Sequence, residues 1–195
     1  MKKYSAILLG LIAIALYFIP TANEILEYNR NLILINHQYY RIITGHFVHF
    51  SVEHLFWDVS MYIVLGTICC HKNWKLFVQA SIISTVTISV ELLLIETQFT
   101  HYRGLSGIDT ALYSIIILDS IYKNFQDKYY LQSFSSFTLG GLLISKITYE
   151  FISNKAIFAN STSFVPLPSA HFIGLLIGII LCYKKYKKKV LQCRT

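Results

Sequence analysis

The sequence predicts an all-α membrane protein that folds as one bundle of six transmembrane helices. Of its 195 residues, 54% are hydrophobic and only 14% are charged, a balance that soluble domains rarely reach. The charged residues also gather between apolar stretches of roughly 17 to 21 residues, the length that crosses a ~30 Å hydrocarbon core as a helix. These stretches run approximately over residues 4–20, 52–70, 76–95, 104–122, 129–149 and 165–183.

Each stretch is expected to be helical, because the bilayer core offers the backbone no water and leaves it to satisfy its own hydrogen bonds. The first stretch follows Lys2 and Lys3 as in a signal peptide, but no small-residue cleavage site follows Pro20, so we expect a retained span. No repeat or linker divides the chain. Residues 1–195 are therefore expected to form one membrane domain, with a basic cytoplasmic tail over 184–195.

Lysine and arginine residues predict the orientation of the bundle. With a cytoplasmic N-terminus, twelve of the 17 basic residues fall in cytoplasmic segments and four in external ones, while Lys146 lies inside the fifth span. The positive-inside rule favours this arrangement, which predicts an integral membrane protein with both termini in the cytoplasm. The external segment 21–51, called loop one below, is semi-apolar and suits the membrane–water boundary.

The net charge of +7 does not indicate a nucleic-acid partner. Five lysines lie within residues 184–189, directly after the last apolar stretch, and no recognition module accompanies them. A basic cluster beside a span is typical of contact with anionic lipid, so the lipid bilayer is the expected partner. The four cysteines lack metal-like spacing, and neither a metal nor a cofactor is expected. No feature of the sequence indicates an oligomeric state.

Two polar residues stand at the outer ends of predicted spans, on the same side of the membrane. Ser106 lies near the outer end of the fourth span and His171 near the outer end of the sixth. A serine hydroxyl is a weak nucleophile that needs a neighbouring base, and imidazole titrates near neutral pH. The two residues are therefore candidates for a catalytic dyad that needs no third carboxylate. Gly104 and Gly107 flank the serine and suit a tight helix entry, whose unpaired backbone N–H groups could bind an oxyanion.

Small residues at helical spacing follow both candidate residues. Such residues let two membrane helices approach closely, which would bring the histidine within hydrogen-bond reach of the serine. They are Gly107 and Ala111 in the fourth span, and Gly174 and Gly178 in the sixth.

A third polar cluster enters the second span from the same side. His54 and Asp58 are four residues apart and share a helical face. Ionisable groups inside a membrane are costly and usually functional. A zinc site is disfavoured, because the cluster has no H-E-x-x-H motif and His46 and His49 precede the helix. We expect His54 to help stabilise an oxyanion, and His49 and Arg41 to brace loop one.

Together these residues resemble the rhomboid family of intramembrane serine proteases. That family has a six-helix core with G-x-S-G at the start of helix four, matched here by Gly104–Gly107. Its A-H-x-x-G-x-x-x-G motif in helix six is matched by Ala170–Gly178. The resemblance covers almost the whole chain. Its aromatic-arginine pair in loop one and its histidine-rich entry to helix two resemble Tyr40 and Arg41, and His49, His54 and Asp58.

Two positions depart from the family pattern. The family usually has asparagine at the position of Asp58, where an ionised carboxylate would repel an oxyanion, so Asp58 must be neutral, turned away or structural. Thr110 stands where the family often has an aromatic residue that stacks on the catalytic histidine. These departures, the bare six-span length and the segment 165–171 resemble the rhombosortase branch, whose members process surface proteins with a C-terminal Gly-Gly-type sorting tail.

The resemblance implies a serine endopeptidase that cleaves membrane-anchored proteins near the outer membrane face. Ser106 would be the nucleophile and His171 the general base. One open alternative is an inactive relative that binds and escorts membrane proteins, which Asp58 and Thr110 favour. The sequence assigns no confident role to Lys146 or Glu91. The other alternative is a small transporter, disfavoured by the lack of an inverted repeat. Its polar path would consist of His54, Asp58, Glu91 and Asp109.

Overall fold

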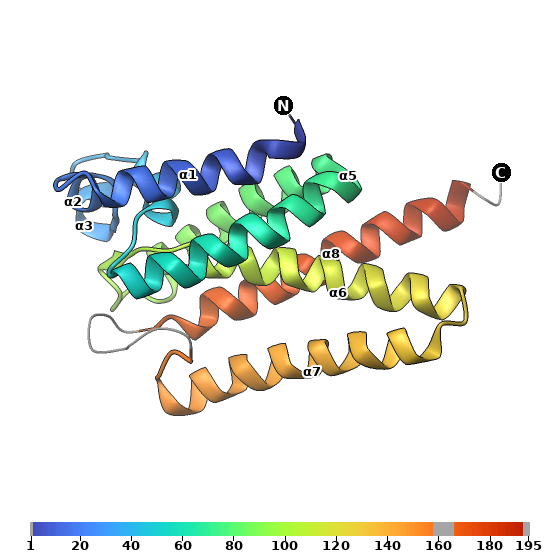
Figure 1. Ribbon diagram of the computed structural model, residues 1–195. Coiled ribbons are helices and arrows are strands. Elements are labelled where there is room, and N and C mark those ends of the chain that lie inside the picture. Colours follow the sequence, from blue (N-terminus) through green and yellow to red (C-terminus); the bar gives the residue numbers. More distant parts are fainter. Residues whose placement is uncertain (1, 158–165, 193–195) are drawn as a thin grey trace.

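Long helices that run between two ends of an elongated bundle make up most of the computed structural model (Figure 1). The structure describes residues 2–157 and 166–192. Each helix crosses the bundle once, except one that crosses it and returns (Figure 1). The long helices are α1 (Ser5–Tyr17), α5 (Val52–Leu94), α6 (Ser106–Gln126), α7 (Tyr130–Ser153) and α8 (Pro168–Gln192).

Helix α5 consists of two arms of opposite direction that meet at Asn73 (Figure 1). Asn73 has non-helical backbone angles (φ −162°, ψ 92°), and its side-chain oxygen accepts the N–H of Leu76, which caps the start of the second arm. The arms match the predicted spans 52–70 and 76–95. Within the described residues, α5 is the one helix both long and apolar enough to cross a membrane, so the count of six spans stays a prediction.

The other long helices differ from the predicted spans mainly at their ends. Helix α6 begins at Ser106, two residues after the predicted start, because Gly104 has φ +123°, which a helix does not accept. Helix α7 runs past the predicted end at 149 to Ser153 and ends on left-handed Asn154. Helix α8 continues to Gln192, so most of the predicted tail is helical. Residue 165, the predicted start of the last span, lies outside the described residues.

Short elements fold loop one against the bundle. A two-residue strand in loop one pairs antiparallel with a strand just ahead of α6, so that Tyr28 lies opposite Tyr102. The short elements are the 3-10 turns η1 (Lys2–Tyr4) and η2 (Gly45–Phe47), the helices α2 (Ala22–Leu26), α3 (Arg30–Leu34) and α4 (Arg41–Thr44), and the strands β1 (Tyr28–Asn29) and β2 (His101–Tyr102).

Helices α6 and α8 touch through their backbones. A Cβ atom built on Gly174 would overlap the carbonyl oxygen of Gly107, and one built on Gly178 would lie 2.8 Å from the carbonyl oxygen of Ala111. From the other side, a Cβ on Gly107 would lie 3.0 Å from the carbonyl oxygen of Ala170. No larger side chain fits between the two helices at these positions, so the four small residues fix how closely and at what level the helices meet.

A buried carboxylate ties three helices together in the second half of α6, the half nearer the end of the bundle that holds both termini (Figure 1). Asp119 on α6 lies 3.0 Å from Lys123 Nζ and 3.5 Å from Lys72 Nζ on α5. Lys185 and Tyr186 on α8 both donate hydrogen bonds to Asp119 Oδ1, the tyrosine at 2.6 Å. Basic residues predicted to be cytoplasmic therefore converge on one side chain of α6.

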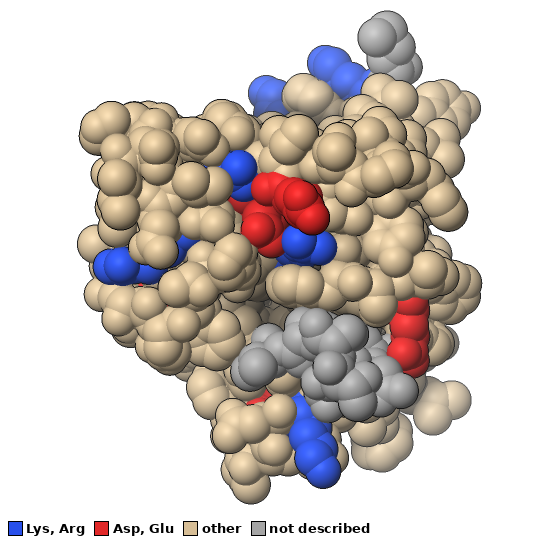
Figure 2. Space-filling model, turned by 90° about the vertical axis from the view of Figure 1, so that its left-hand side faces the viewer, with Lys and Arg blue, Asp and Glu red and all other residues tan. Residues whose placement is uncertain are grey.

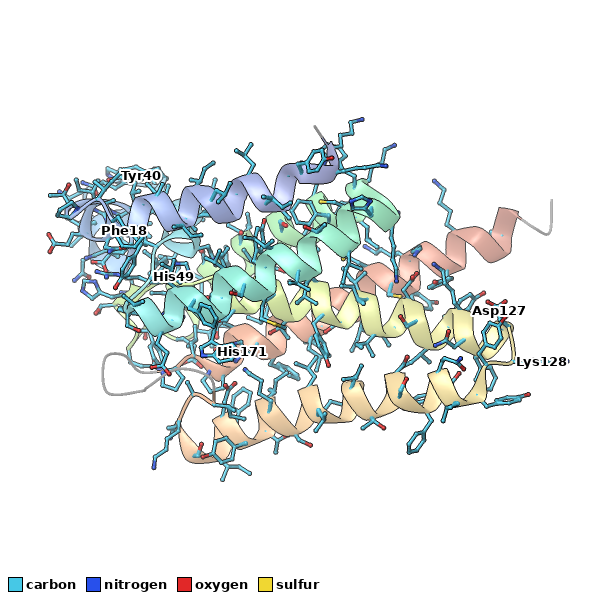
Figure 3. All side chains as sticks on the ribbon, viewed as in Figure 1. Phe18, Tyr40, His49, Asp127, Lys128 and His171 are labelled. Carbon is cyan, nitrogen blue, oxygen red and sulfur yellow. The ribbon has the colours of Figure 1, made fainter. Side chains whose placement is uncertain are left out.

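The two ends of the bundle differ in character. His49 and His171 lie at the end formed by loop one, whereas Asp127 and Lys128 lie at the end that holds the termini (Figure 3). Viewed onto the loop-one end, charged side chains of both signs gather near the centre of a face that otherwise carries few of them (Figure 2). Along the sides, the long helices expose large apolar side chains, as suits contact with lipid. They include Leu8, Leu11, Val64, Ile82, Leu142, Ile144 and Ile180.

Loop one contributes two fully buried histidines to the interior, His46 and His49. His46, in η2, has its Nε2 atom 3.2 Å from the hydroxyl oxygen of Ser89, and its ring meets the ring of Tyr102 edge to face. Burial, which disfavours the charged form, lowers the pKa of His46 to about 4. The ring is therefore neutral at pH 7 and packs as an uncharged group between loop one and α5.

We predict that Gly174→Ala destabilises the bundle, because the added methyl group must push α6 and α8 apart. The expected loss in the free energy of unfolding is about 1–3 kcal/mol, the usual range for overpacking. The matched control is Gly141→Ala on α7, where a Cβ meets nothing within 4 Å. Thermal unfolding of both variants in detergent checks the prediction. Equal melting temperatures for the two variants would contradict the close contact.

We also predict that acid destabilises the protein partly through His46. An unfolded chain protonates this ring near pH 6.5, while the folded chain does so only near pH 4. The unfolded state thus binds more protons between these values, and the free energy of unfolding falls by up to about 3 kcal/mol as the pH drops from 6.5 to 4. Denaturant titrations at pH 8, 6 and 4.5 should show a smaller fall for His46→Gln. The exposed His71→Gln should leave the fall unchanged.

Candidate active site

The backbone ahead of α6 is held on both sides before Ser106 begins the helix. The N–H of Leu105 donates a 2.8 Å hydrogen bond to Asp58 Oδ2 on α5. The N–H of Gly104 donates to the carbonyl oxygen of Gly45 in loop one at 3.3 Å. Because the residues just before Ser106 are fixed to α5 and to loop one, the start of α6 has a defined position.

Gly104 is required by both its conformation and its surroundings. Its φ of +123° lies in a region that side-chain-bearing residues rarely adopt. A Cβ atom here would also lie 2.8 Å from both Asp58 Oδ2 and His54 Nε2. The buried hydroxyl of Tyr102 donates to the carbonyl oxygen of Gly104 at 3.2 Å, and burial raises the pKa of Tyr102, so the hydroxyl keeps its proton.

Asp58 is the centre of a buried polar group at the start of α5. Its Oδ2 atom, which accepts the Leu105 N–H, lies 3.2 Å from His54 Nε2 and 3.5 Å from His49 Nε2. Burial lowers the pKa of His49, which keeps that ring neutral at pH 7. Of the three possibilities left open by the sequence, this geometry favours a structural carboxylate, because the oxygen is already engaged by the backbone ahead of the serine.

Glu27 ties loop one to the strand that leads into α6. Its two carboxylate oxygens accept hydrogen bonds from His101 Nδ1 at 2.8 Å and from Arg103 Nε at 2.9 Å. The guanidinium of Arg103 also lies 4.9 Å from the ring centre of Phe50, a cation–π contact. This group was not anticipated from the sequence, because its members are more than seventy residues apart and meet only through the β1–β2 pairing.

Arg41 lies inside loop one, where its side chain is buried. Its Nη1 atom donates to the carbonyl oxygens of Glu24 at 3.0 Å and Glu27 at 2.8 Å, and its Nε atom donates to Gln38 Oε1 at 2.7 Å. These bonds join α4 to α2 within the loop. They are the contacts that a bracing role for Arg41 needs.

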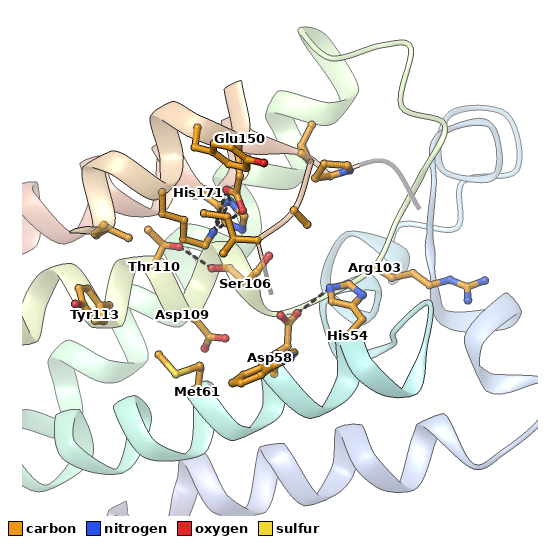
Figure 4. Close-up of a pocket in the computed structure, with 18 of the residues that line it drawn as sticks. His54, Asp58, Met61, Arg103, Ser106, Asp109, Thr110, Tyr113, Glu150 and His171 are labelled. Atoms are coloured by element: carbon orange, nitrogen blue, oxygen red, sulfur yellow. Dashed lines mark hydrogen bonds and ion pairs between the residues drawn. The ribbon is translucent and has the colours of Figure 1, made fainter. Parts of the chain in front are cut away.

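His171 lies near the start of α8 and contacts a charged pair on α7 (Figure 4). Its Nδ1 atom is 2.6 Å from Glu150 Oε2 and 3.3 Å from Lys146 Nζ. Lys146 in turn lies 2.8 Å from Glu150 Oε1, one helical turn away. Glu150 is only 1% exposed, so the histidine, the carboxylate and the ammonium group form one buried unit.

Ser106 and His171 face the same pocket (Figure 4). Their helices meet at Gly107 and Gly174, each one to three residues from the candidate side chain. The two side chains are not hydrogen-bonded to each other in this structure. Catalytic hydrogen bonds are often long without substrate and shorten on binding, so the arrangement is compatible with a dyad.

The pocket has a volume of about 720 Å³ and opens between α5, α6 and α7. Its lining is mainly apolar, and its polar side chains include those of His54, Ser106 and His171. Within it, Asp109 and Thr110 lie on α6 beyond Ser106, and Thr110 Oγ1 donates to the carbonyl oxygen of Ser106 at 2.8 Å. The apolar wall includes Trp57, Met61, Tyr113, Leu142, Tyr149 and Leu167.

Backbone N–H groups at the start of α6 are placed beside the serine. The first turn of the helix begins with the hydrogen bond from Asp109 N to the carbonyl oxygen of Leu105. The N–H groups of Ser106, Gly107 and Ile108 therefore precede the helical ladder and are available to an acceptor. Their dipoles add to the positive end of the helix, which suits a developing negative charge.

The sequence did not assign Glu150 to the site, although a signal was present. The predicted fifth span ended at 149, one residue before this glutamate, and Lys146 inside that span had no role. A lysine and a glutamate four residues apart face the same side of a helix and can neutralise each other. Placed in an apolar helix, such a pair marks a functional position, because isolated charges there are costly.

The structure separates the residues of the predicted transport path. His54, Asp58 and Asp109 line the pocket, whereas Glu91 is not part of its lining. In the described part of the chain, no group of three or more histidine, cysteine, aspartate or glutamate side chains is arranged to hold a metal ion.

Comparison with known proteins places the chain in a family. A family model described as Rhomboid domain matches residues 36–188, which include the candidate serine and histidine, α5 to α7 and most of α8. A search of curated proteins gave no significant match. The chain belongs to the rhomboid family, whose members are integral membrane proteins and generally act as intramembrane serine proteases.

Proposed function

We propose that this protein is an intramembrane serine endopeptidase in which Ser106 and His171 form a catalytic dyad. The main support is the backbone contact between Gly107 and Gly174, which sets both side chains on the wall of one pocket. A merely structural serine and histidine would not need a shared cavity. The membership of the rhomboid family adds the reaction class.

In the proposed reaction, the Ser106 hydroxyl attacks the scissile carbonyl carbon and passes its proton to His171 Nε2. Nε2 is the available nitrogen, because Nδ1 is engaged by Glu150. The protonated ring then donates that proton to the leaving amine as the C–N bond breaks, which leaves an acyl-enzyme ester on the serine. A water molecule then attacks the ester carbonyl carbon and passes a proton to His171 Nε2. The ring returns a proton to the Ser106 oxygen as the ester bond breaks, which releases the carboxylate product.

The oxyanion of each tetrahedral intermediate would be bound by N–H groups at the start of α6, with Gly107 supplying one of them. His54 is the side chain proposed to assist, since its Nε2 atom lies next to Gly104 at the pocket wall. Asp58 serves in this scheme by holding His54 and the Leu105 N–H, and so aligns the donors without accepting the substrate charge itself.

The proposed substrates are membrane-anchored proteins cleaved near the outer membrane face. An apolar pocket beside a helix with few buried side chains suits a transmembrane segment that enters from the lipid, and α7 and loop one are the elements proposed to control that entry. In the proposed topology, the end with both termini and the basic residues faces the cytoplasm of a bacterial cell. The rhombosortase branch, with C-terminally anchored substrates, is the proposed subfamily.

The second candidate function is that of an inactive relative that binds and escorts membrane proteins. The observation that favours it is Thr110, whose hydroxyl bonds to its own helix rather than to His171. A protein that is folded but has no reactive serine at position 106 would select this function. A direct test of serine reactivity therefore separates the two candidates.

We predict that a fluorophosphonate labels the purified protein in detergent at Ser106. Labelling should vanish in Ser106→Ala and fall at least about 10³-fold in rate in His171→Ala, because the hydroxyl loses its general base. The control is Ser136→Ala, a buried serine on α7 outside the pocket, which should label as wild type does. A folded wild-type protein that does not react, or equal labelling of all variants, would refute the protease assignment.

We further predict that Asp58 acts as a hydrogen-bond acceptor and that its charge is dispensable. Asp58→Asn keeps an oxygen for the Leu105 N–H and should retain labelling and stability. Asp58→Leu leaves that N–H unsatisfied and should lower the free energy of unfolding by about 1–3 kcal/mol and slow labelling. Asp127→Leu in an exposed turn is the control. If Asp58→Asn is as damaged as Asp58→Leu, the charge itself is needed.

A further inference from the structure

We infer that Glu150 is a positioning residue for His171, held in place by Lys146, so that the site works as a serine–histidine pair with a third, orienting carboxylate. This inference rests on the proposed function, because it assigns Glu150 a role in preparing the base for Ser106. It goes beyond that function by assigning to α7 a direct part in the chemistry.

The geometry of the buried unit decides where the protons lie. Lys146 is an ammonium donor to both carboxylate oxygens of Glu150, Oε1 at 2.8 Å and Oε2 at 2.9 Å, and cannot accept a hydrogen bond. One of these oxygens, Oε2, also lies 2.6 Å from His171 Nδ1. Two atoms at that distance need a proton between them, and the ring must supply it. Nδ1 therefore carries the hydrogen, and the 3.3 Å approach of Lys146 to Nδ1 is a contact between two donors.

This arrangement selects the tautomer that catalysis requires. With its hydrogen on Nδ1, a neutral His171 presents a lone pair at Nε2, which can take the proton of Ser106. When the ring becomes protonated, the Glu150 carboxylate offsets the new positive charge at close range, and it also offsets the charge of Lys146. Lys146 alone would oppose protonation of the ring, so the glutamate is needed wherever the lysine is present.

The same contact fixes the orientation of the imidazole ring. In the rhomboids that this chain resembles, an aromatic side chain one turn after the serine often stacks on the histidine, and Thr110 stands there instead. Its hydroxyl is bound to the carbonyl oxygen of Ser106. The hydrogen bond that His171 Nδ1 donates to Glu150 supplies a directional restraint from the opposite side, on α7 rather than α6.

A purely structural role explains the pair less well. Helix α7 buries only Ser133, Ser136, Ile147 and Glu150, so most of it faces outward. A leucine at position 150 would attach α7 to α8 without the cost of desolvating two charges, because replacing a buried ion pair by apolar groups is often neutral or stabilising. The glutamate is aimed at one atom of the histidine, which packing alone does not demand.

The test is the isosteric substitution Glu150→Gln, read by fluorophosphonate inactivation kinetics. Lys146 Nζ lies within 2.9 Å of both carboxylate oxygens and will hold the one oxygen that the amide keeps. That oxygen is then less able to restrain the Nδ1 hydrogen than the carboxylate is, so the ring form with hydrogen on Nε2 gains population. We expect the maximal inactivation rate to fall about 10²- to 10⁴-fold, with little change in the half-saturating probe concentration. Glu91→Gln, the same change at another buried glutamate outside the pocket, should react as wild type does.

A second variant separates this mechanism from a general defect. In Lys146→Met/Glu150→Gln the amide is free to rotate and can again accept the Nδ1 hydrogen, so the rate should recover about 10-fold or more over Glu150→Gln. A structural role predicts the opposite, since removing both charged groups removes both contacts. Equal rates for Glu150→Gln and Glu91→Gln, or a double variant no faster than the single one, would overturn the inference.

Histidine ¹⁵N NMR makes the test independent of protease activity. The His171 signal is assigned by its absence in His171→Gln, and we expect hydrogen at Nδ1 in the wild type and a larger share of the Nε2-protonated tautomer in Glu150→Gln. A wild-type protein that fails to label but shows this change would refute the proposed function and leave the positioning contact standing. A wild-type protein that labels, with its hydrogen at Nε2 in both forms, would refute the positioning role alone.

Discussion

The backbone contact between α6 and α8 is the constraint on which the rest of the structure depends. Because Gly174 lies against the backbone of Gly107, and Gly178 against that of Ala111, main-chain atoms largely set the distance between the helices. Side chains can adopt new rotamers, whereas two touching backbones allow little adjustment. The relative depth of the residues at the two helix starts is therefore a property of the main chain, and everything packed around α6 and α8 inherits it.

Around this contact, acidic side chains join segments that are distant in sequence through hydrogen bonds and ion pairs. Glu27 joins loop one to the segment before α6. Asp58 joins α5 to the backbone directly ahead of α6, and Glu150 joins α7 to α8. At the other end, Asp119 gathers donors from α5, α6 and α8. In a lipid bilayer, apolar burial distinguishes poorly between one helix face and another. These directional hydrogen bonds and ion pairs therefore give each segment a single register.

Much of the architecture followed from the sequence, and what did not follow has physical reasons. Apolar length located the long helices, and small-residue spacing pointed to the meeting of α6 and α8. The fold of loop one could not be read in this way, because its short elements depend on partners such as Tyr102 that are distant in sequence. Glu150 was missed because hydropathy ends a span at a charge, whereas its neutralisation by Lys146 lets the helix continue.

Helix α7 couples substrate entry to the alignment of His171 in the proposed site. This helix lies at the edge of the bundle and, with loop one, is proposed to control how a substrate enters from the lipid (Figure 1). It also carries the carboxylate that aims His171. When α7 is displaced, that carboxylate moves with it, so His171 is misaligned while the site is open. The alignment returns only when the helix packs against the bound substrate. Substrate entry and activation of Ser106 are then linked to two positions of the same helix. This protects other proteins from the serine while it is exposed but not yet activated.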